Sequence, residues 1–147
     1  AEALLEKFIE SQPAHPDLAG LFTALDRLYQ TQTSPSSSEL RRWSEDSANS
    51  QRALTATYYL ARNEARLKRM DRAEKAFQTF VEASPDHALA EDARIELANL
   101  FLASNKPAQA LAVLGDHPGA AMDFYRGLAH AAGGNYAEAA KAFDQSL

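Results

Sequence analysis

The sequence contains no cysteine, and this absence excludes several kinds of chemistry at once. Without thiols there is no disulfide, no thiolate nucleophile and no cysteine-based zinc site. Valine and isoleucine are also scarce, with two of each among 147 residues. Because these β-branched residues favour strands, their scarcity argues against a β-sheet. The sequence also has no apolar run near the roughly 20 residues that span a bilayer, and no basic and apolar leader at its start.

Alanine and leucine dominate the composition instead. Thirty alanines favour helices, so the composition predicts an all-α fold. The net charge is -5, yet the stretch 41–75 holds nine basic and five acidic residues. The acidic balance of the rest argues against nucleic acid as a partner, because nucleic-acid binders carry a strongly basic surface. The basic stretch suits an acidic protein surface.

Apolar residues recur at three-to-four spacing in short segments, and polar, proline-rich or glycine-rich breaks separate these segments. This pattern predicts amphipathic helices joined by short loops, which place neighbouring helices antiparallel. Ser36 and Glu39 have the spacing of a capping box and predict a helix start. Pro107 suits the first turn of another helix, where its missing N–H does no harm.

A sequence similar to that of the first fifteen residues recurs in the middle of the chain. Ala1–His15 reads AEALLEKFIESQPAH and Ala73–His87 reads AEKAFQTFVEASPDH, with six identical positions. Self-similarity of this kind predicts an array of helical units that stack on one another. Pro85 and Pro118 end two successive units at matching places.

The segment Gly127–Phe143, GLAHAAGGNYAEAAKAF, resembles the tetratricopeptide repeat, a unit of two antiparallel helices about 34 residues long. In such a unit a small residue on the first helix packs against an alanine on the second, and a large apolar residue one turn later fills the wedge. The resemblance implies a right-handed superhelix of about nine helices. It also implies packing roles for Ala61, Ala73, Phe77, Ala98, Phe101, Ala110, Gly127, Tyr136, Ala139 and Phe143.

The repeat frame also predicts how the chain is divided. It reads as a single solenoid segment in which an unpaired second helix precedes four helix pairs. Both ends then fall inside repeats, so the segment is expected to be a piece of a longer protein. The expected bounds are 1–12 for the unpaired helix and about 15–48, 51–84, 88–115 and 119–147 for the pairs.

Three positions depart from the repeat pattern. Glu64 and His130 stand where the first helix usually carries an aromatic residue, and Asp26 stands where a small residue belongs. The first pair lacks the alanine of the second helix, and Trp43 is expected to take its packing role. The pattern is therefore specific for the last three pairs and looser for the first.

No group of residues predicts catalysis or a bound cofactor. His15 and His87 occupy the same place after a proline, which favours a polar turn residue, and His117 lies in a turn. A metal site needs three or four converging ligands, and no such cluster is visible. No phosphate-binding glycine loop and no nucleophile elbow are present either. We therefore expect a protein that is not an enzyme and that carries no metal or cofactor.

The remaining candidate is a surface. In tetratricopeptide arrays the first helices line a concave face that usually holds a peptide or a partner helix. Projected onto this chain, the face predicts a partner-binding set. The alternative is that Arg62, Arg66, Arg69 and Arg72 form an ordinary solvated face paired with nearby acids. The carboxylate clamp of some chaperone cofactors is not supported. The predicted set is Tyr58, Arg62, Arg66, Asp92, Asn99, Phe124 and Tyr125.

The sequence thus favours a non-catalytic scaffold that binds a peptide or helical segment of another protein. Two alternatives stay open: self-association through uncovered terminal repeats, and a helical accessory domain of a larger enzyme. Terminal apolar residues that would serve a homodimer are Leu4, Leu5, Phe8, Phe143 and Leu147. Segments such as FIESQPAHPDLA are similar to repeats of bacterial envelope proteins, which favours the envelope or periplasm and leaves the cytoplasm open.

Overall fold

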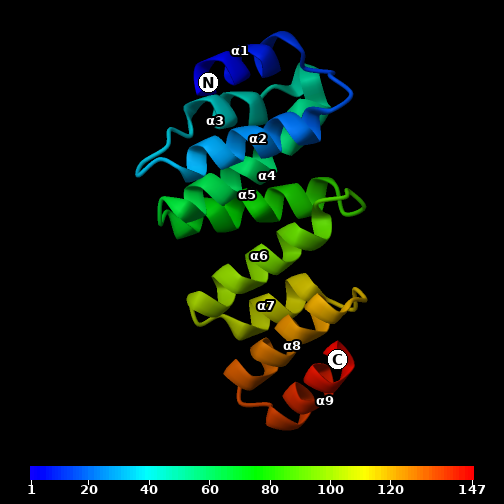
Figure 1. Ribbon diagram of the computed structural model, residues 1–147. Helices are drawn as coiled ribbons and strands as arrows, with labels where there is room; N and C mark the ends of the chain where they lie inside the picture. Colours follow the sequence, from blue (N-terminus) through cyan, green and yellow to red (C-terminus); the bar gives the residue numbers. More distant parts are fainter. The chain divides into compact units, whose positions relative to one another are not determined.

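The computed structural model describes residues 1–147 and contains nine α-helices, one short 3₁₀ helix and no strand (Figure 1). The all-α fold that the composition predicted is confirmed. The chain divides into two compact units, Ala1–Pro85 and Asp86–Leu147. None of the helices is long and apolar enough to cross a membrane.

Unit 1 holds five α-helices, and a 3₁₀ turn precedes the fourth. Helix α4 is the longest and packs against both α3 and α5, while α2 packs against α1 and α4. The helices are α1 (Glu2–Ser11), α2 (Leu18–Gln30), α3 (Ser38–Ser44), η1 (Ser47–Asn49), α4 (Ser50–Arg66) and α5 (Met70–Ala83).

Aromatic rings fill the core of unit 1. The Phe22 ring lies between the rings of Trp43 and Tyr59, with centroid distances of 5.7 and 5.6 Å. Trp43 is fully buried, in the packing role that the sequence predicts for it. Aromatic pairs at these distances stabilise a core beyond their buried area alone. They fix α2, α3 and α4 against one another.

The start of α3 differs from the capping box that the sequence suggested. The helix begins at Ser38, and no side chain caps its first turn. Instead the Ser36 hydroxyl accepts the Ser38 backbone N–H at 3.2 Å. Ser37 is buried, and its hydroxyl accepts a hydrogen bond from the Asn63 amide of α4 at 2.9 Å. The serine-rich loop is therefore held both by the local hydrogen bond of Ser36 and by Asn63 of α4.

Unit 2 consists of two antiparallel helix pairs. Helix α7 begins at Pro107, as the sequence predicts, and α8 packs against both α7 and α9. The helices are α6 (Ala90–Ala103), α7 (Pro107–Leu114), α8 (Ala120–Ala132) and α9 (Tyr136–Ser146).

The turns inside three helix pairs share one backbone geometry. Lys68, Asn105 and Gly134 each follow a first helix and have φ values of 61°, 58° and 82°. After each of them, the next backbone N–H returns to a carbonyl of the preceding helix, for example Arg69 to Glu64 at 2.9 Å. This is the left-handed ending that favours glycine. Only the last of the three turns has glycine there.

The last pair shows why its first helix contains glycine. A Cβ atom added to Gly127 would lie 2.5 Å from Cε1 of Phe143 on α9, closer than any real contact. Ala139 is buried beside this crossing. The other small residues of the expected packing set, Ala61, Ala73, Ala98 and Ala110, are also fully buried. A side chain at Gly127 would force the Phe143 ring, and with it the contact between α8 and α9, to shift.

Tyr136 does not have the packing role that the repeat pattern predicts for it. Its side chain is 73% exposed at the first residue of α9, so it does not fill a helix crossing. Phe143, one of the residues expected to fill the wedge, is half-buried, while Phe77 and Phe101 are buried. The position of Tyr136 in the repeat motif does not by itself reveal this exposure.

Candidate protein-interaction site

Unit 1 contains two buried carboxylates, and arginines surround each of them. The first is Asp26 of α2, a residue that departs from the repeat pattern and is 6% exposed. Its Oδ2 accepts hydrogen bonds from Arg62 at 3.2 Å and from Gln30 at 3.0 Å, and its Oδ1 accepts one from Arg66 at 3.0 Å. Hydrogen bonds to a charged group are stronger than neutral ones, which offsets the cost of burying the acid.

The second buried carboxylate is Glu64 on α4, which is 1% exposed. Its Oε1 accepts a hydrogen bond from Arg41 of α3 at 3.2 Å. Its Oε2 lies 3.5 Å from Arg69 and 4.0 Å from Arg72, and it accepts no hydrogen bond. Both departures from the repeat pattern in unit 1 are thus centres of arginine clusters.

Three residues of the expected binding set therefore have roles inside unit 1. The side chains of Arg62 and Arg66 are 29% and 23% exposed, and both contact Asp26. Tyr58 is buried, with its ring 5.5 Å from that of Phe80 and 5.9 Å from that of Phe77. Tyr58 does not line an open face, so the structure corrects its expected role as a surface anchor.

The other four members of the set lie in unit 2. Asp92 and Asn99 are exposed, seven residues apart on α6, and share one face of that helix. Phe124 on α8 is 45% exposed, and its ring meets that of the half-buried Tyr125 at 5.5 Å. These residues remain accessible to a partner.

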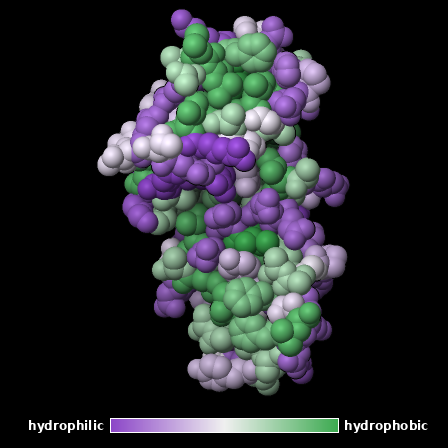
Figure 2. Space-filling view, viewed as in Figure 1, coloured by the Kyte–Doolittle hydropathy of each residue, from purple (hydrophilic) through white to green (hydrophobic).

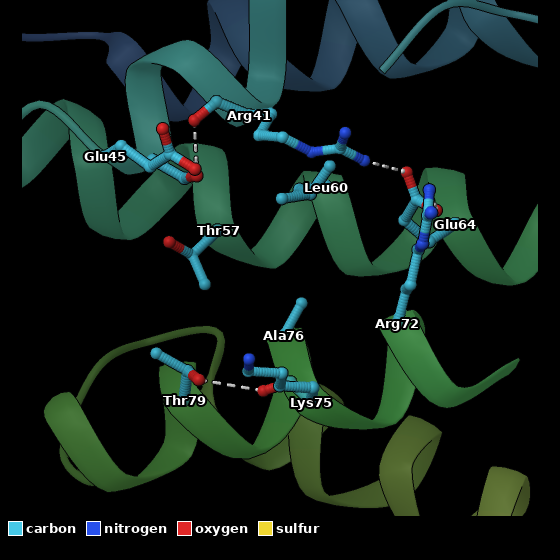
Figure 3. A pocket seen from close by; sticks show the side chains of 10 residues that line it. Arg41, Glu45, Thr57, Leu60, Glu64, Arg72, Lys75, Ala76 and Thr79 are labelled. Atoms are coloured by element: carbon cyan, nitrogen blue, oxygen red, sulfur yellow. Dashed lines mark hydrogen bonds and ion pairs between the residues drawn. The ribbon is translucent and has the colours of Figure 1, made fainter. Parts of the chain in front are cut away.

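An open pocket of about 460 Å³ lies between α3, α4 and α5 (Figure 3). Its wall carries three basic residues, Arg41, Arg72 and Lys75, and two acidic ones, Glu45 and Glu64. None of the residues that line this pocket belongs to the partner-binding set that the sequence predicts. The only sequence signal for it is the basic character of the stretch 41–75.

Two of the four histidines are turn residues, as their positions suggest. Nδ1 of His15 accepts the Asp17 backbone N–H, and Nδ1 of His87 accepts that of Leu89, both at 3.0 Å. The two matching positions of the internal repeat therefore shape the entry to the next helix in the same way. No group of three or more His, Asp or Glu side chains is arranged to hold a metal ion.

The comparison with family models decides the classification. A model described as the tetratricopeptide repeat-like domain matches residues 12–147. The chain belongs to this family. Comparison with curated proteins and with solved structures gave no match. Domains of this family generally mediate protein–protein interaction and are typically non-catalytic, and no transmembrane helix is present.

One polar network of this tetratricopeptide repeat-like domain has no counterpart in the sequence prediction. The buried Arg52 of α4 donates to Asp46 at 2.6 Å and to the carbonyls of Ile9 and Glu10 at 3.3 and 3.2 Å. Arg42 donates to both carboxylate oxygens of Glu10 at 3.0 and 2.9 Å. These contacts join α1 to α3 and α4. The contacts to α1 span more than 30 residues, so no local pattern signals them.

The same network shifts the pKa values of its acids. Hydrogen bonds from Arg42, and then from Trp43, lower the pKa of Glu10. A hydrogen bond from Asn49, followed by one from Arg52, lowers the pKa of Asp46. In contrast, burial raises the pKa of Glu6, against a hydrogen bond that Tyr29 donates to it.

Proposed function

We propose that this tetratricopeptide repeat-like domain is a non-catalytic scaffold that binds a peptide or helical segment of another protein. The observation that carries the proposal is the accessible aromatic pair of Phe124 and Tyr125 on a first helix. Large aromatic side chains of this kind are favoured anchors at interfaces. Asp92 and Asn99 supply polar groups on α6, another first helix.

Unit 1 is expected to contribute less through its first-helix face. Arg62 and Arg66 already donate to Asp26, so a partner that used them would have to compete with a nearly buried carboxylate. The similarity of FIESQPAHPDLA to repeats of bacterial envelope proteins supports a partner in that compartment.

The scaffold proposal is tested by affinity capture from extracts of the source cells. We expect the variant with Phe124→Ala and Asn99→Ala to lose a protein that the unmodified chain retains. Gln78→Ala is the matched control, because Gln78 is exposed on the second helix α5. Equal capture by all three chains would remove the first-helix face of unit 2 from the binding site.

A second candidate function is self-association. Leu4 and Phe8 on α1 are 73% and 43% exposed, and Figure 2 shows hydrophobic side chains gathered over α1. Exposed apolar patches of this kind favour association between copies. Light scattering across a wide range of protein concentration tests it, because a constant monomer mass would exclude this function. A mass that grows with concentration in the unmodified chain but not in Leu4→Ser would support it.

A further inference from the structure

The pocket between α3, α4 and α5 lies on a different side of α4 from the Asp26 cluster. Its α4 residues include Leu60 and Glu64, whereas Arg62 and Arg66 contact Asp26. Residues two apart on an α-helix point in nearly opposite directions, about 200° apart. The pocket is therefore separate from the first-helix face of unit 1.

Positive charge exceeds negative charge around this pocket. Three basic side chains, Arg41, Arg72 and Lys75, line it, and Arg69 reaches the same Glu64 carboxylate from the α4–α5 turn. Glu64 is one of two acids in the wall and is already shared among three arginines. The exposed Lys75 forms no ion pair within the chain. The cluster therefore has unsatisfied capacity for an anionic group.

The arginines are also loosely held. The nitrogen–oxygen distances from Arg69 and Arg72 to Glu64, 3.5 and 4.0 Å, are longer than a good hydrogen bond. Their side chains are 47% and 61% exposed and donate no hydrogen bond to Glu64, so they can turn toward a ligand while Glu64 keeps its hydrogen bond from Arg41. A second, smaller hollow, which Arg72 shares, continues along residues 68–72.

The floor of the pocket is less polar than its rim. Figure 3 shows Thr57 and Leu60 of α4 facing Ala76 of α5 across the open space, with Arg41 and Arg72 both directed at Glu64. An occupant would therefore meet an apolar surface beside a cationic edge. A free inorganic anion would contact only the cationic edge.

We propose that this pocket binds an acidic segment of a partner protein, with a carboxylate between Arg72 and Lys75 and an apolar neighbour against Leu60 and Ala76. The planar fork of an arginine matches a carboxylate, which favours this pairing. Nucleic acid fits less well, because its phosphate backbone needs a long basic surface, and outside the stretch 41–75 the chain is acidic. The inference rests on the proposed role as a protein-binding scaffold and names a further contact surface for it.

The test uses three fluorescein-labelled peptides that differ only in a central tract: Glu-Leu-Glu, Gln-Leu-Gln or Lys-Leu-Lys. A single-stranded RNA of similar length is the fourth probe. Fluorescence anisotropy measures the Kd of each for the whole chain. Lys75→Glu is the pocket variant, because Lys75 holds no ion pair that its loss would break. Arg27→Glu on α2 is the control, another exposed cation that takes the same change of charge.

We expect the Glu-Leu-Glu peptide to bind more tightly than the other probes, and its Kd to rise about tenfold in Lys75→Glu and to stay within about twofold in Arg27→Glu. Equal weakening by both substitutions would place the peptide elsewhere and overturn the proposal. Tighter binding of RNA, or equal binding of all three peptides, would also overturn it. None of these outcomes decides the scaffold function itself, which depends separately on the capture experiment with Phe124 and Asn99.

Discussion

Asp26 offers the sharpest test of how the charges of unit 1 are arranged. Asp26→Asn keeps the size of the side chain and removes its charge. Asp26 accepts hydrogen bonds from Arg62, Arg66 and Gln30, and the new amide would direct an N–H at one of the arginines. Each hydrogen bond to a charged group contributes about 1.5–3 kcal/mol. Because both arginines are about a quarter exposed and regain some water, we expect unfolding to become easier by about 2–4 kcal/mol.

Glu64→Gln is the comparison variant. Glu64 accepts one hydrogen bond, and its three arginines are about half-exposed, so we expect a loss of roughly 1 kcal/mol or less. Urea unfolding followed by the fluorescence of Trp43, the single buried tryptophan, reports on unit 1. An Asp26→Asn midpoint equal to that of the unmodified chain, or a larger loss in Glu64→Gln, would refute this reasoning.

Three further predictions concern packing, backbone and pH. Gly127→Leu should lower the free energy of unfolding by about 1–3 kcal/mol, because the leucine side chain would overlap Phe143. The midpoint of thermal unfolding, followed by circular dichroism, should fall, and an unchanged midpoint would contradict this packing. Lys68→Gly should gain about 1 kcal/mol in urea unfolding, since Lys68 has a φ of 61°, and a loss would show that the turn is not strained. Because the pKa of Glu10 is lowered in the folded protein, its carboxylate stabilises the fold above the ordinary pKa of 4.5. This stability is lost as the pH falls through the lower pKa of the folded state. Glu10→Gln should therefore weaken the decline of the urea midpoint in acid. An identical decline in Glu10→Gln would rule out that role.

The helices were predictable because their signals are local. The alanine content, the spacing of apolar residues and the proline at residue 107 each act within a few turns of chain. The internal repeat also identified the buried alanines, because close crossings need small residues wherever they recur. These features need no knowledge of which distant residues meet.

The charge clusters were only half predictable. Asp26 and Glu64 stood out as departures from the repeat, but their partners lie up to 40 residues away and are fixed by how α2, α3 and α5 pack on α4. The burial of Tyr58 and the exposure of Tyr136 follow from the same tertiary packing. The pocket at Arg72 and Lys75 likewise exists only once three helices come together.

Photo-cross-linking in the source cells is the measurement that tests the scaffold function most directly. A benzophenone amino acid placed at Phe124 should yield a discrete adduct with another protein. The same amino acid at Gln78, exposed on α5, should not yield that adduct. Identical adducts at both positions, or none at Phe124, would contradict a scaffold that binds its partner through its first helices.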